Sequence, residues 1–337
     1  MRAIVYKESR QIDHPEALFE IELPEPQPGP RDLLVRVQAI SVNPVDYKVR
    51  QRMPSASPRV LGWDAVGEVV AVGQSVTAFK PGDRVWYAGA FDRPGSNAEM
   101  QCVDERIVSI APRSLSAPDA AALPLTSITA WELLFERLGI KPGKHPSGDV
   151  LLVSGAAGGV GSILLQLASR LTAATVIATA GRAESRLWVE SLGAHHVVDY
   201  HEPLAPQLAK LGFPAVTHVA SLTHTDQYFP QFVELIAPFG HLALIDDPPA
   251  LDVSAMKFRS LSLHWEFMFS RSMFETNDMN AQGQLLRDVA TLVDAGVLRT
   301  TATQQLGSIN VENLRRAQAQ LERGGVRGKL VLAGFDD

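Results

Sequence analysis

The sequence has a single cysteine among its 337 residues, Cys102, and this scarcity excludes several kinds of site. One cysteine cannot form an intramolecular disulfide, and it cannot supply the thiolates of a cysteine-based structural zinc site. A chain without disulfides suits a reducing compartment. The N-terminal MRAIVYKESR is also not followed by the apolar segment of a signal peptide, so the sequence predicts a cytoplasmic protein.

Basic charge is also scarce. The chain has 31 Lys and Arg against 37 Asp and Glu, a formal net charge of -6, and no run of basic residues. Nucleic acids and anionic membrane surfaces attract basic patches, so the composition predicts neither as a partner. Residues 150–169 carry no charge and are long enough to span a bilayer. Glycines interrupt this stretch, however, and we interpret it as a strand, a turn and a buried helix.

The sequence instead contains two kinds of secondary-structure pattern, and it is too long for one typical core. In the first 125 residues, short apolar or alternating runs are separated by proline and glycine clusters, which is typical of strands. Residues 125–139 change to the spacing of a helix. From residue 149 strands alternate with helices, as in a parallel doubly wound sheet. The apolar run SLHWEFMF, within residues 261–269, is expected to be its last strand.

A glycine-rich turn in residues 153–168, VSGAAGGVGSILLQLA, is the strongest local signal. It lies between an apolar strand and an amphipathic helix, which is the context that a dinucleotide pyrophosphate needs. Gly155 and Gly158 have no Cβ to keep the phosphates away, and Gly161 allows the helix to pack closely on the strand. Gly159 and Val160 complete the turn. The alternative is a tight turn with no ligand.

The end of the next strand, in TVIATAGRAESRLW, indicates which nicotinamide cofactor is bound. An NAD site has Asp or Glu there to hold the ribose hydroxyls. This chain has Ala180 and Gly181, followed by Arg182 and Arg186, whose guanidinium groups suit a 2′-phosphate. We therefore predict NADPH as the cofactor. The alternative is that both arginines only decorate an exposed helix.

Five segments in this order resemble the medium-chain dehydrogenase/reductase superfamily: GWDAVGEVVAVG, PGDRV, AALPLTSITAW, GAAGGVG and GKLVL. The resemblance covers essentially the whole chain and is greatest to the zinc-independent, quinone oxidoreductase-like branch, which includes "zinc-type alcohol dehydrogenase-like" proteins. It implies an α/β fold with a GroES-like β-rich catalytic domain in residues 1–126 and 273–337. A Rossmann domain with a doubly wound parallel sheet would occupy residues 127–272. It also implies a homodimer.

The same resemblance raises the question of zinc. Zinc-bearing members have Gly-His-Glu where this chain has Gly62, Trp63 and Asp64, and they carry a cysteine in the loop that reads SVNPVDYK here. An indole cannot ligate zinc. We therefore expect no metal, and we expect Trp63 to form an aromatic wall where zinc-bearing relatives have a ligand. The alternative is a metal held by Asp64 and a histidine.

By resemblance, Asn43, Tyr47 and Lys48 would face the substrate, and Thr129 would lie beside the nicotinamide. Tyr47 or Lys48 would then donate a proton or polarise a carbonyl. For Asn43, which precedes a proline, ordinary turn chemistry is the alternative. The aromatic residues further suggest a flat apolar pocket made of Trp63, Trp86, Trp265 and Phe267.

These observations predict an NADPH-dependent, zinc-independent oxidoreductase that reduces quinones or other α,β-unsaturated carbonyl compounds by hydride transfer. Such acceptors are electron-poor, so their reduction does not need the Lewis acid that stabilises an alkoxide. Two alternatives remain at this point. One is a zinc-dependent alcohol or aldehyde dehydrogenase, and the other is a catalytically weak NADPH-binding protein that acts as a sensor or structural component.

Overall fold

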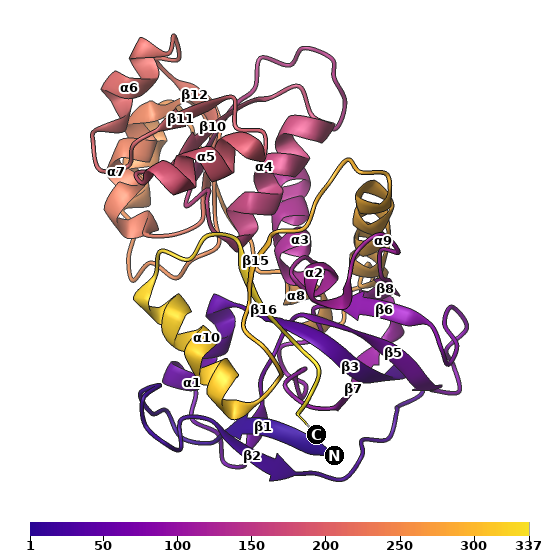
Figure 1. Ribbon diagram of the computed structural model, residues 1–337. Helices are drawn as coiled ribbons and strands as arrows, with labels where there is room; N and C mark the ends of the chain where they lie inside the picture. Colours follow the sequence, from indigo (N-terminus) through magenta and orange to yellow (C-terminus); the bar gives the residue numbers. More distant parts are fainter. Residues whose placement is uncertain (337) are drawn as a thin grey trace. The chain divides into compact units, whose positions relative to one another are not determined.

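The computed structural model describes residues 1–336, which form two compact units (Figure 1). The β-rich unit comprises residues 1–128 together with the described residues from 269 onward, and the parallel-sheet unit comprises residues 129–268. The parallel-sheet unit is thus an insertion between two segments of the β-rich unit.

The β-rich unit contains two sheets. The smaller has the strand order β2-β1-β4, and the larger has the order β15-β16-β3-β5-β6-β8, with β7 also paired to β3. The long strand β3 is buried along most of its length because it pairs with β16, β5 and β7. The strands are β1 (Arg2–Tyr6), β2 (Phe19–Glu22), β3 (Asp32–Val42), β4 (Arg59–Val60), β5 (Ala65–Val72), β6 (Arg84–Tyr87), β7 (Met100–Asp104), β8 (Val108–Ile110), β15 (Ala302–Gln305) and β16 (Lys329–Ala333).

Helices of the β-rich unit are few and mostly short. Two of them, α9 and α10, have strongly amphipathic sequences whose apolar residues are buried, as expected for helices lying on a sheet surface. The helices are α1 (Pro44–Arg52), α2 (Ala117–Ala121), α8 (Ser270–Met273), α9 (Asn280–Asp294), α10 (Val311–Arg323) and the 3-10 turn Glu105–Ile107. Helix α3 (Pro124–Trp131) contains the boundary between the units.

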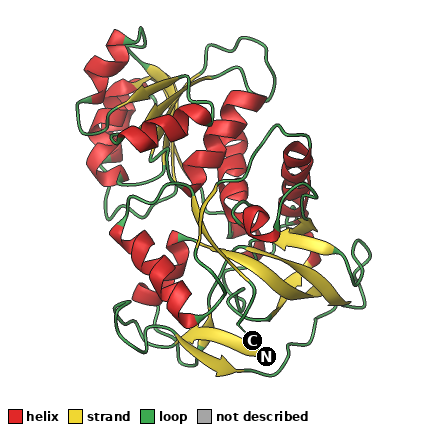
Figure 2. Ribbon diagram, in the orientation of Figure 1, coloured by secondary structure: helices red, strands yellow, loops and turns green. Residues whose placement is uncertain are grey.

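The parallel-sheet unit has one six-stranded sheet in the order β11-β10-β9-β12-β13-β14, and all of its pairs are parallel. Counted within the unit this is the order 3-2-1-4-5-6, which is that of a dinucleotide-binding doubly wound sheet. Figure 2 shows helices flanking this sheet. The elements are β9 (Val150–Ser154), α4 (Gly159–Leu171), β10 (Thr175–Thr179), α5 (Ala183–Ser191), β11 (His196–Val198), α6 (Leu204–Lys210), β12 (Val216–Ser221), α7 (Thr225–Leu235), β13 (Ile236–Leu244), the 3-10 segment Val253–Arg259 and β14 (Ser262–Trp265).

The predicted fold class is therefore confirmed, but two predicted elements are wrong in detail. The helix expected over 125–139 is α3 followed by a π-helix, Glu132–Arg137, in which the Leu138 N–H bonds to the Leu133 carbonyl at 2.9 Å. The strand expected over 261–269 has only four residues, because the chain after β14 turns and buries Glu266. Apolar periodicity does not reveal either change, because an α-helix and a π-helix, or a long and a short strand, can follow similar apolar spacing. It also does not show that Trp265 and Phe267 are exposed.

Candidate functional site

The glycine turn connects β9 to α4, as the sequence predicted. Gly155 has a φ of +73°, a conformation that favours glycine, and its carbonyl accepts a 3.1 Å hydrogen bond from the Gly158 N–H. Gly158 is the N-cap of α4, and Gly159 and Val160 form its first turn, where both are partly exposed. The first N–H groups of a helix have no partner within the helix, so this end suits an anion.

Packing within the protein requires glycine at one position of this turn but not at another. A Cβ at Gly161 would collide with the backbone of Ala156, so the protein's own packing requires Gly161. A Cβ at Gly158 would meet only the Gly155 carbonyl oxygen, at an ordinary 3.4 Å. The fold therefore does not need a glycine at 158, and the space outside it is open to a ligand. This arrangement fits a dinucleotide pyrophosphate.

The two predicted arginines lie at the carboxyl ends of β10 and β11. Arg182 is the N-cap residue of α5 and is exposed. Arg186 donates hydrogen bonds to the carbonyls of Ala180 at 3.1 Å and Val197 at 3.3 Å, so its guanidinium ties the two strand ends together. Of the predicted pair, Arg182 therefore has the more accessible side chain. Arg186 also stabilises the ends of the two strands through its hydrogen bonds.

Asp64 is the centre of a buried polar cluster in the β-rich unit. Its Oδ2 accepts hydrogen bonds from Ser41 Oγ at 2.6 Å, Asn43 Nδ2 at 2.8 Å and Lys329 Nζ at 3.1 Å. Its Oδ1 accepts from the Leu125 N–H at 2.7 Å. Both carboxylate oxygens are thus occupied by donors of the protein itself.

Lys329, at the start of β16, is the cation of this cluster and is fully buried. Its ammonium donates to Asp64, to the Asn43 side-chain oxygen and to the Val42 carbonyl, so all three of its protons have acceptors. Burial lowers the pKa of Lys329, and the Asp64 carboxylate opposes this change. Burial raises the pKa of Asp46 to about 7, although the Asn43 N–H and Lys329 favour its charged form.

Asn43 belongs to this cluster rather than to an open surface. It is the N-cap of α1, and its side chain is buried. The side-chain amide donates a hydrogen bond from Nδ2 to Asp64 and accepts one at Oδ1 from Lys329. Tyr47 and Lys48 follow on α1 and are partly exposed. Thr129 is buried in the second half of α3, within the parallel-sheet unit. The structure thus brings Asn43 together with Asp64, next to Trp63 in the chain.

Trp63 is fully buried among aromatic rings. Its indole stacks on Phe91, with ring centroids 5.7 Å apart, and meets the ring of Phe269 edge-on at 6.0 Å. Its Nε1–H donates to the Ala90 carbonyl at 3.1 Å. Of the aromatic residues expected from sequence to line a pocket, Trp63 and Trp86 lie in the β-rich unit, and Trp265 and Phe267 lie in the parallel-sheet unit. Phe91 and Phe269 had no sequence signal of their own.

A second group of buried charges lies within the parallel-sheet unit. Glu132, on the π-helix, and Glu266, just after β14, are both buried. Burial, and next the neighbouring Glu132 carboxyl, raise the pKa of Glu266 to about 9. Arg137 opposes this, with its Nε 3.0 Å from Glu266 Oε2. Two carboxyls so close favour a state in which one keeps its proton.

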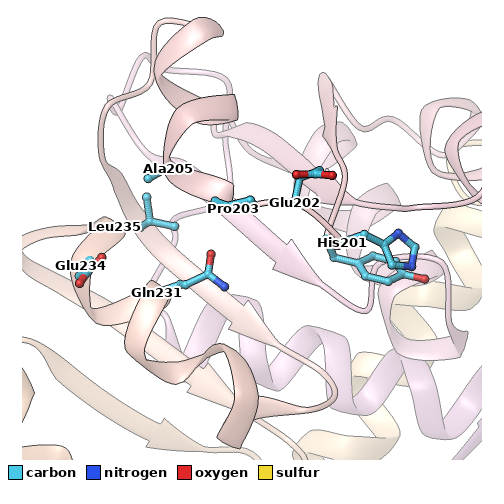
Figure 3. A pocket seen from close by; sticks show the side chains of 8 residues that line it. His201, Glu202, Pro203, Ala205, Gln231, Glu234 and Leu235 are labelled. Atoms are coloured by element: carbon cyan, nitrogen blue, oxygen red, sulfur yellow. The ribbon is translucent and has the colours of Figure 1, made fainter.

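A pocket of about 370 Å³ lies beside the residues that follow β11 (Figure 3). Figure 3 shows His201 and Glu202 at one end of it, and Gln231 and Glu234 on α7 at the other. None of the predicted site residues lines this pocket. It nevertheless begins where β11 ends, next to the strand end that carries Gly181.

Neither a metal-binding cluster nor a membrane-spanning helix is found among the described residues. Within residues 1–336, no group of three or more His, Cys, Asp or Glu side chains is arranged to hold a metal ion. No helix among these residues has the length and apolar character needed to cross a membrane.

Comparison with known families and sequences agrees with this architecture. Residues 29–112 match the alcohol dehydrogenase GroES-like domain, and residues 192–332 match the zinc-binding dehydrogenase family. A zinc-type alcohol dehydrogenase-like protein of Staphylococcus aureus (strain MSSA476) is 42% identical over 322 residues, which are 94% of this chain and 95% of that protein.

Solved structures agree as well. A Rhizobium etli CFN 42 protein named as a candidate zinc-dependent alcohol dehydrogenase is 52% identical, with a TM-score of 0.96 over 100% of this chain and 99% of its own. A quinone oxidoreductase of Pseudomonas syringae pv. Tomato DC3000 is 26% identical, with a TM-score of 0.84 over 98% and 99%. A mycobacterial protein solved with NADPH is 28% identical, with a TM-score of 0.83 over 99% of each. The chain therefore belongs to the medium-chain dehydrogenase/reductase superfamily, in its quinone oxidoreductase-like branch.

Proposed function

We propose that the chain is an NADPH-dependent, zinc-independent oxidoreductase that reduces quinones or other α,β-unsaturated carbonyl compounds. The proposal that no zinc is needed rests on the packing of Trp63 and the hydrogen bonds of Asp64. The indole of Trp63 is not a metal ligand, and it is packed between aromatic rings. Both oxygens of Asp64 already accept hydrogen bonds from the protein. This donor set does not fit a catalytic zinc.

The glycine turn supports the cofactor part of the proposal. Gly155, Gly158, Gly159, Val160 and the N-terminus of α4 would hold the pyrophosphate, because Gly158 leaves space that the protein does not fill. When bound, the nicotinamide supplies a hydride, which an electron-poor acceptor takes up without a Lewis acid. NADPH in a relative's structure and the position of Arg182 favour the phosphorylated cofactor.

The chain's own residues would orient the acceptor and exclude water. The buried Trp63 and Phe269 and the partly exposed Phe91 give the β-rich unit an apolar aromatic wall, which suits a flat ring. Tyr47 and Lys48 are the side chains of α1 that we propose to polarise the acceptor oxygen or donate its proton. Asn43, Asp64 and Lys329 would hold the start of α1 in place for this task.

The test is NADPH oxidation against a panel of quinones and enones, with the metal content of the protein measured in parallel. We expect turnover that survives exhaustive chelation. Stoichiometric zinc, lost together with activity on chelation, would instead support a zinc-dependent dehydrogenase. Tight NADPH binding without turnover of any acceptor would support a sensor or structural protein.

Cofactor choice is tested by Arg182→Ala. Loss of a charge-assisted contact costs about 1.5–3 kcal/mol, so the dissociation constant for NADPH should rise about ten- to a hundredfold. The constant for NADH should change little, since it has no 2′-phosphate. Equal affinity of the unmodified protein for the two cofactors would refute the assignment.

A further inference from the structure

An imidazole occupies the strand end at which a dinucleotide's ribose is held. Strands β10 and β11 are adjacent and parallel, with Thr179 paired to Val198, so the residues after each strand lie at the same edge. Gly181 follows β10 and His201 follows β11. A Cβ on Gly181 would collide with Nδ1 and Cε1 of His201, so the ring lies directly against this glycine.

Asp199 fixes the orientation of that ring. Its Oδ1 is 2.9 Å from the His201 backbone nitrogen and 2.8 Å from His201 Nδ1. A carboxylate can only accept hydrogen bonds, so Nδ1 carries a proton. The His201 N–H is the main reason that the pKa of Asp199 lies below its usual range. The His201 side chain is 59% exposed, and its remaining nitrogen, Nε2, points away from Asp199.

Whether Nε2 is protonated determines whether this site can bind a phosphate group. In the neutral ring Nε2 is an acceptor, and a phosphate oxygen is an acceptor as well, so the two do not pair. In the imidazolium Nε2 is a donor and the ring is a cation. The other titratable or charged groups near this place are Asp199, Tyr200 and Glu202 from its own segment, Arg186 from α5, and Tyr228 and Glu234 from α7. Arg182, the N-cap residue of α5, directly follows Gly181 in the chain.

We propose that His201, as an imidazolium held by Asp199, binds the 2′-phosphate of NADP(H), so that the preference for NADP(H) over NAD(H) declines as the pH rises. This inference rests on the proposed use of NADPH. Histidine is the one side-chain type in this group that commonly gains or loses its charge near neutral pH. Binding of the 2′-phosphate therefore takes up a proton at His201, and NAD(H) binding does not.

The test uses calorimetric titration of the full-length protein with NADP⁺ and with NAD⁺, in buffers of different ionisation enthalpy, between about pH 6 and pH 9. We expect proton uptake with NADP⁺ only, and an NADP⁺ affinity that falls about tenfold or more across this range, as for a lost charge-assisted contact. The affinity for NAD⁺ should stay nearly constant.

Two variants separate charge from shape. His201→Gln should lower NADP⁺ affinity about ten- to a hundredfold at neutral pH and abolish the proton uptake. His201→Lys should keep the affinity but make it independent of pH, because lysine stays charged in this range. The matched control is His145→Gln, since His145 is exposed in the loop before β9, at the amino ends of the strands.

The possible failures are distinguishable. If the unmodified protein binds NADP⁺ no more tightly than NAD⁺ at any pH, the proposed use of NADPH fails. If it prefers NADP⁺ but takes up no proton, or if His201→Gln keeps both the affinity and the uptake, only the role of His201 is overturned.

Discussion

At the scale of single residues, Trp63 separates this chain from zinc-bearing relatives, and its replacement by histidine tests that difference. Removing a large buried aromatic side chain costs about 3–5 kcal/mol, and somewhat less where histidine fills part of the space. We therefore expect Trp63→His to lower the free energy of unfolding, measured in denaturant, and to weaken acceptor binding. It should not create a zinc site, because Asn43 stands in the loop where a cysteine would be needed.

The control is Phe79→His. Phe79 is a buried aromatic residue of the same unit and is not among the proposed site residues, so stability should fall without the specific effect on the acceptor. Stoichiometric zinc in purified Trp63→His protein would show that the surrounding donors suffice for a metal.

Lys329 offers a second prediction at this scale. Lys329→Met leaves the buried Asp64 carboxylate without its cation, and breaking a buried pair typically costs about 3–5 kcal/mol. In the double variant Lys329→Met with Asp64→Asn, neither position carries a charge. Part of the loss in the free energy of unfolding should therefore be recovered. Unfolding free energies that simply add would show that the pair is not coupled.

Glu266 gives the protein a specific dependence of stability on pH. Its pKa is raised from 4.5 to about 9 in the folded chain, so the folded state keeps a proton that the unfolded state loses. This contribution is complete below about pH 4.5 and is lost as the pH rises toward 9. Glu266→Gln should flatten the decline in unfolding free energy between these limits. An unchanged slope, equal to that of the exposed control Glu234→Gln, would contradict this.

Sequence reasoning found some of these residues and missed others for a physical reason. Trp63 and the glycines lie in contiguous motifs, where the neighbours in the chain are also the neighbours in space. Lys329 and Asp64 are far apart in the chain and meet because β16 pairs with β3, which in turn pairs with β5. His201 meets Gly181 through strand pairing in the same way. Such encounters depend on topology, which a local pattern does not contain.

At the scale of secondary-structure elements, the turn between β9 and α4 predicts opposite effects for two similar changes. Gly161→Ala must push α4 away from Ala156, so it should destabilise the fold and broaden the thermal transition. Gly158→Ala meets only an ordinary contact, so stability should be kept while cofactor affinity falls. Thermal unfolding and NADPH titration of the two variants measure this contrast. Equal loss of stability in both would show that the fold, not the ligand, requires Gly158.

The π-helix shows where element-level prediction from sequence stops. The apolar spacing of residues 125–139 correctly predicts a helix, but residues 125–130 are buried on every side and not on one face. It does not contain the change from α to π geometry after Trp131. Glu132, the first residue of the π-helix, is buried and interacts with Glu266. π-Segments within helices are frequent at functional sites, and this one supplies half of a buried carboxyl pair.

At the scale of the whole molecule, we predict a homodimer. Strand β14 ends the order of the parallel sheet, and its free edge can pair with a second copy. Exposed aromatic residues lie on or near it, including Phe258, which is 96% exposed, and Trp265. Light scattering at micromolar concentration should give twice the chain mass. Trp265→Lys should shift the mass toward the monomer, whereas Leu187→Lys, at an exposed site on α5, should not; a monomeric unmodified protein would refute the prediction.

The position of β16 has a consequence for the order in which the two units can fold during synthesis. A ribosome adds roughly 5–20 residues per second, so residues 129–268 emerge as a continuous stretch seconds before β16 does. The larger sheet of the β-rich unit cannot be completed by then, because β16 belongs inside it. Until Lys329 leaves the exit tunnel, β3 has an unpaired edge and Asp64 lacks its cation. A nascent chain that stops short of β16 would therefore carry a complete parallel sheet and an unfinished β-rich unit, so the inserted unit can fold before the unit that contains it.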